Sequence, residues 1–347
     1  MRDILPDVDQ WLSNGEPVAL ATVIHTWGSS PRREGAKMAL TPDGKIAGSV
    51  SGGCVEGAVF ETGVGVLRTG QPQLLKFGVA DETAWDVGLA CGGQIEVFVK
   101  PLDPAFFDLL KVELLGRQPF CVASIVAGPS NLLGSEILIK GDRVYNTLGP
   151  GLDVIASEKA RLAMAEGRSQ RMEIDWDREN LQLFIEVVKS PSTLVIVGGA
   201  HIAIALVTLA KTLGYATVVV DPRRAFGNVE RFPHVDRLIQ AWPEEALEEI
   251  ELTSETAIAM LTHDPKIDDP ALKIALNSRA FYIGALGSRK TQEKRHQRLM
   301  ADGLSPEQLS RLHGPIGLEI GGESPEEIAL AIMAEVVAAR HKVEVAT

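Results

Sequence analysis

The stretch STLVIVGGAHIAIALVTLAKTLGYATVVVDPR, residues 192–223, has the pattern of a strand, a glycine turn, a helix and a second strand. Val195 to Val197 form a β-branched apolar run, Ala203 to Lys211 an apolar helical segment, and Ala216 to Val220 a second β-type run. A strand–helix–strand unit of this length is typical of sheets with parallel strands. The stretch therefore predicts a Rossmann-like, doubly wound parallel sheet in the C-terminal part of this α/β chain.

The turn of this unit resembles a dinucleotide-binding fingerprint. Gly198, Ala200 and Ala203 occupy its three small-residue positions, and Asp221 follows Gly198 by 23 residues, where an acidic residue that binds ribose hydroxyls is expected. Ala200 replaces the glycine that lets the backbone approach a pyrophosphate. His201 falls in the first helical turn and is either a phosphate contact or a surface histidine. A bound nucleotide such as NAD(P) is therefore an expectation.

Two further strand-like runs end in polar loops, within AIAMLTHDPKIDD (257–269) and FYIGALGSRKTQEKR (281–295). The polar residues at these places are His263, Asp264, Ser288 and Arg289. Ligands of open α/β sheets bind beyond the carboxyl ends of the strands, so these residues are expected to share a crevice with the Gly198 turn. The alternative for the His-Asp pair is a turn with a helix cap.

The C-terminal segment HGPIGLEIGGESPEEIALAIMAEVVAARH (313–341) contains a capping box, formed by Ser324 and Glu327. Apolar residues at helical spacing then predict a helix with one buried face. His313 and Glu319 precede this helix and are placed at the edge of the expected site.

A domain boundary is predicted near residues 180–192, where charged residues and Ser-Pro-Ser precede the first strand of the C-terminal sheet. The chain is therefore divided into an N-terminal domain, 1–190, and a C-terminal Rossmann-like domain, 191–347.

The N-terminal domain contains an internal repeat. EPVALATVI (16–24) aligns with QPFCVASIV (118–126), and GQPQLLKF (70–77) aligns with GRSQRMEI (167–174). Each copy has the pattern strand, loop, strand, turn, strand, glycine-rich bend, helix, glycine, strand. Residues 1–190 are therefore predicted to form a pseudo-duplicated α/β domain with copies at about 16–77 and 118–174.

The bend of the first copy, SVSGGCVEG (49–57), carries a cysteine at the start of a helix predicted at about 54–69. Three small residues precede Cys54: Ser51, Gly52 and Gly53. Successive N–H groups before a helix can bind an anion, and a thiol placed there is favoured as a nucleophilic or metal-binding thiolate. The second copy has Leu152 at the matching position, so the alternative is that Cys54 only packs.

Two other groups could contribute to such a site. Cys91 precedes two glycines in GLACGGQIEVFV (88–99), and its separation of 37 residues from Cys54 is unlike a zinc-binding pair. It is either a second functional thiol or a structural one. Arg32 and Arg33, beside small hydroxyl residues, form either an anion clamp or a solvated loop. Cys121 lies in an apolar strand pattern and is predicted to be a core residue.

Composition excludes several classes of protein. The chain has 347 residues, 45% of them hydrophobic, a net charge of −12 and a pI near 5.2. This acidity disfavours a nucleic-acid partner. No signal-peptide pattern or apolar run of membrane-spanning length is present. Three cysteines do not make a disulfide framework. We therefore expect a cytoplasmic protein with reduced thiols that binds neither nucleic acid nor membrane.

Taken together, the motifs resemble the XdhC/CoxI family, the accessory proteins of molybdenum hydroxylases such as xanthine dehydrogenase. ALATVIHTWGSSPRREGAKMAL and GSVSGGCVE resemble the first domain of that family. VGGAHIAIAL, DPRRAFGNVERFP, THDPKIDDPAL, YIGALGSRK and HGPIGLEIGGESPEEIALAI resemble its Rossmann domain. The chain has Gly-Gly-Ala-His where the family usually has Gly-Ala-Gly-His, which disfavours tight pyrophosphate binding but not the fold.

The resemblance implies a chaperone that binds molybdenum cofactor, protects it during sulfuration and transfers it to a hydroxylase. It implies two partners, a cysteine desulfurase and the molybdenum-binding large subunit of the hydroxylase. In this hypothesis the sulfur of Cys54 contacts molybdenum or relays sulfur, while Gly52 and Gly53 supply N–H donors. Cys91, Arg32 and Arg33 are weaker candidates. A homodimer is expected, because an interface would shield the cofactor.

Two alternatives remain open from the residues. The first is an NAD(P)-dependent oxidoreductase, in which Gly198, Ala203 and Asp221 hold the dinucleotide and His263 or Arg289 meets the substrate. The second is a regulatory module that senses a nucleotide without catalysing a reaction.

Overall fold

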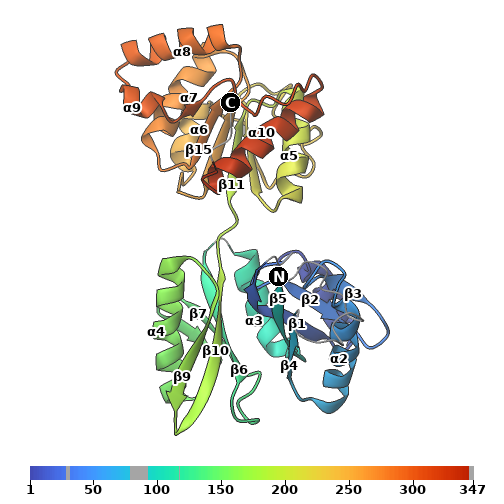
Figure 1. The fold of residues 1–347 in the computed structure, drawn as a ribbon. Helices are drawn as coiled ribbons and strands as arrows, with labels where there is room; N and C mark the ends of the chain where they lie inside the picture. Colours follow the sequence, from blue (N-terminus) through green and yellow to red (C-terminus); the bar gives the residue numbers. More distant parts are fainter. Residues whose placement is uncertain (29–31, 79–92, 117, 344–347) are drawn as a thin grey trace. The chain divides into compact units, whose positions relative to one another are not determined.

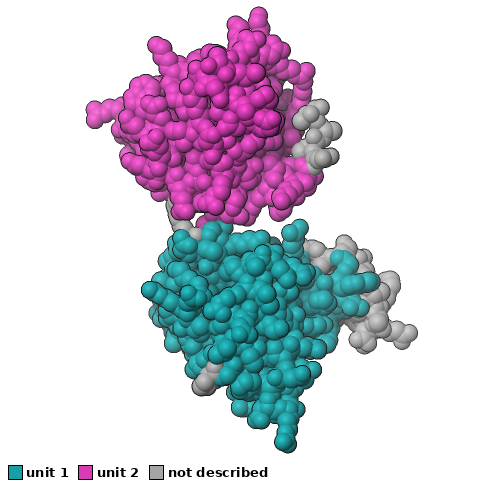
Figure 2. Space-filling view, turned by 90° about the vertical axis from the view of Figure 1, so that its left-hand side faces the viewer, with its two compact units in different colours: residues 1–190 teal, residues 191–347 magenta. Residues whose placement is uncertain are grey.

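The computed structural model describes residues 1–28, 32–78, 93–116 and 118–343 of the chain. The chain forms two compact units, residues 1–190 and 191–347. Figure 1 shows their elements as a ribbon coloured along the sequence, and Figure 2 shows the two units in separate colours. Each unit has its own sheets and its own hydrophobic cores. In the described residues, no helix is both long and apolar enough to cross a membrane.

Unit 1 contains the same sheet twice. The first has the order β3-β2-β1-β5-β4 and the second β8-β7-β6-β10-β9, and neighbouring strands in both are antiparallel. The first copy comprises β1 (Ala19–Trp27), β2 (Lys37–Leu40), β3 (Ile46–Gly48), α2 (Glu56–Thr69), β4 (Gln73–Phe77) and β5 (Gln94–Pro101). The second comprises β6 (Phe120–Ala127), β7 (Glu136–Lys140), β8 (Arg143–Tyr145), α4 (Pro150–Glu166), β9 (Gln170–Trp176) and β10 (Glu179–Val188). The predicted pseudo-duplication is therefore confirmed.

Each copy covers the outer face of its sheet with its own helix. Figure 1 shows α2 and α4 on the two outer sides of unit 1. Side chains of a strand alternate between faces, so Ala19 and Ala21 face α2 while Leu20 belongs to the core between the sheets. α1 (Leu5–Ser13) and α3 (Pro104–Leu115) complete that inner core. Cys121 is buried in the second copy, as predicted; burial raises its pKa to about 12.

Two buried ion pairs join the copies. Lys37 of β2 pairs with Glu186 of β10 at 2.8 Å, and Lys100 of β5 pairs with Glu136 of β7. None of these four side chains is more than 12% exposed. Both lysines come from the first copy and both glutamates from the second, and the sequence alignment of the copies places Lys37 opposite Glu136. A copy paired with itself would bury like charges, so this asymmetry favours pairing of the two different copies.

Unit 2 is a parallel sheet of six strands in the order β13-β12-β11-β14-β15-β16. The strands are β11 (Thr193–Val197), β12 (Ala216–Val220), β13 (Arg237–Ile239), β14 (Thr256–Met260), β15 (Tyr282–Ala285) and β16 (Leu312–His313). Numbered within the unit, this is the order 3-2-1-4-5-6 of doubly wound dinucleotide-binding folds. The predicted Rossmann-like fold is therefore confirmed.

Helices cover both faces of this sheet. α5 (His201–Thr212) and α10 (Pro325–Arg340) pack on one face, and α6 (Pro243–Glu249), α7 (Pro265–Asn277), α8 (Arg289–Ala301) and α9 (Pro306–Leu309) pack on the other. Leu194 and Ile196 face the first group while Val195 and Val197 face the second. A strand buried on both sides needs apolar residues at consecutive positions, which explains the unbroken run in the sequence.

Candidate functional site

The bend that carries Cys54 lies between β3 and α2 of unit 1. Gly52 and Gly53 have positive φ angles of 83° and 119°. Glycine adopts this region without steric cost, which accounts for two glycines at this turn. The helix begins at Glu56 and not at about residue 54, so Cys54 lies just before its first turn.

The N–H groups of this bend point at a carboxylate of the same chain. Glu56 accepts hydrogen bonds from the hydroxyls of Ser49 and Ser51 and from backbone N–H groups. The N–H donors are those of Val50, Ser51, Gly52, Gly53 and Val55, at 2.8–3.2 Å. Gly52 and Gly53 were predicted to donate to an anionic ligand; they donate instead to Glu56. The bend therefore does bind an anion through its N–H groups, but the anion is the Glu56 carboxylate of the same chain.

These contacts keep Glu56 ionised. Partial burial raises the pKa of the Glu56 carboxyl, but hydrogen bonds from Ser49 and Ser51 outweigh burial and lower the pKa to about 2. The hydroxyl of Ser51 also accepts hydrogen bonds from the N–H groups of Cys54 and Val55. Ser51 and Glu56 together therefore fix the backbone on both sides of the cysteine.

The second copy closes its bend in a similar way. Asp153, in the first turn of α4, accepts hydrogen bonds from the hydroxyl of Thr147 and from the N–H of Leu148, both at 2.6 Å. An acidic residue in the first helical turn thus closes the bend in both copies. The thiol is not shared, because buried Leu152 stands where the first copy has Cys54.

Cys54 is a free, half-buried cysteine that packs against the core under α2. Arg32 lies at the same bend, since its Nε donates to the carbonyl of Ser49 at 3.2 Å. Its guanidinium also lies 3.8 Å from Asp3. Arg33 is exposed. The predicted Cys91 lies outside the described residues. In unit 1 the structure therefore brings Cys54 and Arg32 to one bend, whose shape depends on Glu56.

Replacing Glu56 with glutamine is expected to destabilise unit 1 by about 1–2 kcal/mol at neutral pH, a range that allows for solvent screening. The lowered pKa means that the stabilisation by Glu56 is present above its ordinary pKa of 4.5 and lost as the pH falls towards 2. The stability of Glu56→Gln should therefore fall less over this pH range than that of the wild type. Urea unfolding at several pH values measures both effects.

The matched control for this experiment is Asp153→Asn, which alters the corresponding bend of the second copy. Asp153 accepts fewer hydrogen bonds, so a smaller loss is expected. Equal pH dependence of the wild type and Glu56→Gln would contradict the assigned role of Glu56.

In unit 2, the glycine turn after β11 is covered by the chain itself. Gly198 has a φ of 106°, and a Cβ there would lie 2.6 Å from Cγ2 of Thr262. The N–H of Gly199 donates to Asp221 at 2.7 Å, and its carbonyl accepts from Arg231 at 3.1 Å. Both backbone groups of Gly199 are thus already bonded within the chain.

Asp221, predicted to bind ribose hydroxyls, is completely buried. Each of its carboxylate oxygens accepts two hydrogen bonds, from Gly199 and from the backbone and guanidinium of Arg223. Burial raises the pKa of Asp221, but the bonds from Arg223 and Gly199 outweigh burial and leave the pKa lowered. The acid at the expected spacing therefore holds the turn closed and is not presented to a ligand.

The other predicted residues of unit 2 have mainly structural positions. Ala200 is the residue before α5, and exposed His201 begins that helix and lines an apolar groove between α5 and α10. Asp264 accepts from the N–H of Lys266 and caps α7, and Ser288 caps α8. His263 has a φ of 63° at the turn after β14, a conformation uncommon outside glycine. The predicted His-Asp pair is therefore a turn with a helix cap.

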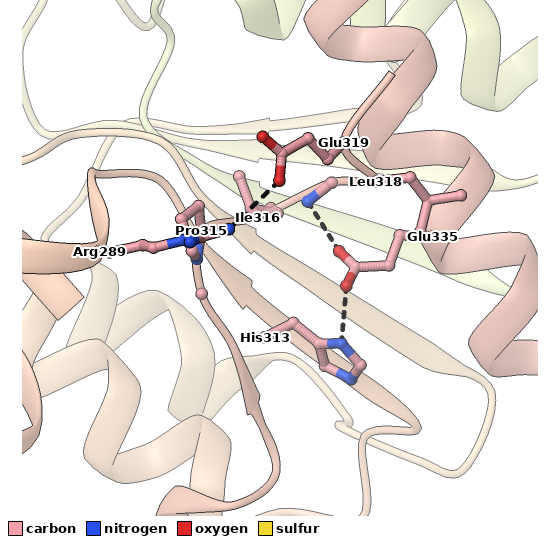
Figure 3. Close-up of a pocket in the computed structure, with 9 residues that line it drawn as sticks. Arg289, His313, Pro315, Ile316, Leu318, Glu319 and Glu335 are labelled. Carbon is pink, nitrogen blue, oxygen red and sulfur yellow. Dashed lines mark hydrogen bonds and ion pairs between the residues drawn. The ribbon is translucent and has the colours of Figure 1, made fainter. Parts of the chain in front are cut away.

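Arg289, by contrast, lines a pocket of about 750 Å³ beyond the carboxyl ends of β15 and β16 (Figure 3). The other lining residues are the segment 313–318, Glu319 and Glu335. His313 and Glu319, placed at a site edge by the sequence, thus belong to its wall. Arg289 and Glu319 form an ion pair at 3.3 Å.

The pocket wall includes a buried carboxylate that was not predicted from the sequence. Glu335 of α10 accepts hydrogen bonds from the hydroxyl of Tyr282 at 2.6 Å, from Nδ1 of His313 at 2.9 Å and from the N–H of Gly317 at 2.7 Å. Burial raises the pKa of Glu335, but the bonds from His313 and Tyr282 leave it lowered overall. The sequence did contain a signal for this residue: Glu335 follows Ile332 by three residues and so lies on the apolar face of the predicted helix, where a charged side chain is unusual.

Among the residues that the structure describes, no group of three histidine, cysteine or acidic side chains is arranged to hold a metal ion.

Comparison with known proteins agrees with this architecture. The XdhC and CoxI family matches residues 11–78, in unit 1, and the XdhC Rossmann domain matches residues 194–336, in unit 2. A protein of Bacillus subtilis (strain 168) named as a probable subunit of xanthine dehydrogenase is 27% identical over 341 residues, covering 97% of this chain and 98% of the relative. The molybdenum cofactor insertion chaperone PaoD of Escherichia coli (strain K12) is 26% identical over 340 residues, covering 98% and 88%.

A crystal structure described as a xanthine dehydrogenase from Bacillus halodurans shares the fold. It superimposes with a TM-score of 0.78 at 24% sequence identity, over 98% of this chain and 96% of that one. The family matches fall on both units and together span more than half of the chain. The resemblance drawn from the motifs is thus confirmed, and the chain belongs to the XdhC and CoxI family.

Proposed function

We propose that this chain is an accessory protein that binds molybdenum cofactor and assists its sulfuration and its insertion into a molybdenum hydroxylase. One relative that it matches over nearly its whole length is named a molybdenum cofactor insertion chaperone, and another is named as a probable part of xanthine dehydrogenase. The proposed partners are the large subunit of the hydroxylase and a cysteine desulfurase. The proposed assembly is a homodimer in the cytoplasm.

The observation that carries this proposal is the thiol at the bend of the first copy. The two copies share their sheet order and their acidic bend closure, but only the first has a cysteine there. An apolar residue fills the position in the second copy, so packing alone does not require sulfur. Thiolate is a soft ligand suited to molybdenum and to sulfur transfer.

In this proposal the roles of the glycines and the arginines differ from those expected from the sequence. Because Glu56 takes the N–H groups of Gly52 and Gly53, those glycines shape the bend and orient Cys54. The anionic part of the cofactor would then be bound by Arg32 and Arg33, of which Arg32 lies at the bend. Arg32 and Arg33 carry permanent positive charge and can bind a phosphate through two parallel hydrogen bonds.

Replacing Cys54 with serine is expected to lower retention of the cofactor at least about tenfold, since a hydroxyl is a far poorer ligand for soft metals. The wild type and the variant would be mixed with free molybdenum cofactor and passed through gel filtration. Molybdenum and pterin would then be measured in the protein fraction. The control is Cys121→Ala, which removes the buried thiol and should leave retention unchanged.

Equal retention by Cys54→Ser and the wild type would refute a metal-binding role for the thiol. A sulfur-relay role is tested separately, by activation of the apo-hydroxylase with cofactor, desulfurase and either protein. Full activation with Cys54→Ser would refute that role as well.

An NAD(P)-dependent oxidoreductase is less well supported by the geometry. The residue expected to bind ribose is buried and bonded to Arg223 and Gly199. We therefore expect no saturable binding of NAD(H) at the Gly198 turn.

A further inference from the structure

We propose that the pocket of unit 2 in Figure 3 binds a small organic phosphate, with Arg289 binding the phosphate and Nε2 of His313 binding a second polar group of the ligand. Residues of unit 2 form this site, and it requires no molybdenum. Here a nucleotide-type fold presents an arginine and a histidine to a cavity, whereas the backbone groups of Gly199 at the glycine turn are already bonded within the chain.

The position and size of the pocket suit a small organic molecule. It lies beyond the carboxyl ends of β15 and β16, the side of a doubly wound sheet on which ligands bind. Its volume of about 750 Å³ lies in the usual range for small-molecule sites and far exceeds that of inorganic phosphate. Pro315, Ile316 and Leu318 supply apolar wall for the organic part.

His313 is held in one orientation. Its Nδ1 bonds to Glu335, and its ring lies against that of Tyr282, with the centroids 4.6 Å apart. Tyr282 donates to the same carboxylate, so three side chains form one connected unit. A carboxylate that accepts at Nδ1 leaves Nε2 as the ring atom for a ligand, an arrangement that recurs where histidine must be oriented. The His313 side chain is 38% exposed, so it is open to the pocket.

Arg289 provides an anion-binding group that is easily released from its present partner. Its ion pair with Glu319 joins two side chains that are 82% and 80% exposed. Exposed pairs of this kind contribute little stability, so a phosphate can replace the Glu319 carboxylate at small cost. Arginine binds phosphate through two parallel hydrogen bonds, and Arg289 is also the first residue of α8, where the helix dipole favours an anion.

The test is calorimetric titration of the full chain with AMP, GMP and ribose 5-phosphate, alongside adenosine and inorganic phosphate. At least one organic phosphate should bind more tightly than both adenosine and inorganic phosphate. Arg289→Gln should weaken that binding about ten- to a hundredfold, the range for losing a charged hydrogen-bonding partner. His313→Asn should weaken it about tenfold and Glu319→Gln should strengthen it, because the competing carboxylate is gone.

The control is Arg279→Gln, which removes an exposed arginine just before β15. This position lies at the amino ends of the strands, whereas the pocket lies beyond their carboxyl ends. It should leave binding unchanged, and so should Cys54→Ser, because the proposed site does not include unit 1. Failure of every organic phosphate to bind would overturn this proposal without affecting the proposed chaperone function. Equal binding by Arg289→Gln and the wild type, or equal affinity for inorganic phosphate, would also overturn it.

Discussion

Replacing Lys100 with methionine is expected to destabilise unit 1 by about 3–5 kcal/mol, the usual cost of removing one partner of a buried ion pair. Lys100 and its partner Glu136 lie in the interior between the two sheets. The variant keeps the apolar stem but leaves the Glu136 carboxylate buried without its cation. For a domain of this size the loss corresponds to a fall in melting temperature of about 6–20 °C.

Urea unfolding followed by tryptophan fluorescence measures this effect, since four of the five tryptophans lie in residues 1–190. The control is Lys76→Met on β4, which removes a 68% exposed lysine from a pair with Glu96 and should cost less than about 1 kcal/mol. The double variant Lys100→Met/Glu136→Met should recover most of the lost stability, because no buried charge remains. A double variant as unstable as the single one would show that the pair does not act as an ion pair.

Replacing Arg295 with methionine is expected to destabilise unit 2 by a similar amount, about 3–5 kcal/mol. Arg295 and its partner Asp268 are 2% and 1% exposed. Burial raises the pKa of Asp268 even with Thr262 and Arg295 opposing it, and loss of Arg295 should raise the pKa further. Binding studies on the pocket should therefore keep this residue intact.

The same substitution should loosen the wall of the pocket. Arg295 bonds to the carbonyl of Leu286 and to Gln292, which in turn donates to the carbonyls of Ala285 and Gly287. Faster hydrogen exchange over residues 282–289 is expected in Arg295→Met. The control is Arg298→Met, which lies on α8 as Arg295 does. It removes a 39% exposed arginine from its ion pair with Asp269 of α7. It should cost only about 1 kcal/mol, and equal effects of the two variants would contradict the role of burial.

The fold of unit 2 was predictable because its determinants are local. An apolar β-type run, a glycine turn and an apolar helix follow one another within residues 192–223, and each depends on the next few residues alone. The duplication in unit 1 was predictable for a related reason, since both copies keep the same order of strands, bend and helix. The cross-pairing of Lys37 and Lys100 with glutamates of the second copy was not, because it depends on how two sheets pack.

The sequence also identified the bend that carries Cys54, since adjacent glycines before a helix are a local signal. It did not identify the group that fills the bend. The glycine N–H groups were expected to bind a ligand, whereas Glu56 reaches back to them from the first helical turn. The same holds for Asp221. Its spacing from Gly198 is that of a ribose-binding acid, but its carboxylate oxygens already accept hydrogen bonds from Arg223 and Gly199.

The pocket of unit 2 was decided by tertiary structure alone. Tyr282, His313 and Glu335 are separated by 22 to 53 residues, and nothing in their spacing links them. They meet because β15 and β16 are neighbouring parallel strands and α10 packs back across the same sheet. The sequence by itself thus determined the secondary structure, the fold class and the family, all of which depend on local pattern. Only the packed chain decided which polar groups satisfy one another and which remain for a ligand, because hydrogen-bond partners are chosen by proximity in space.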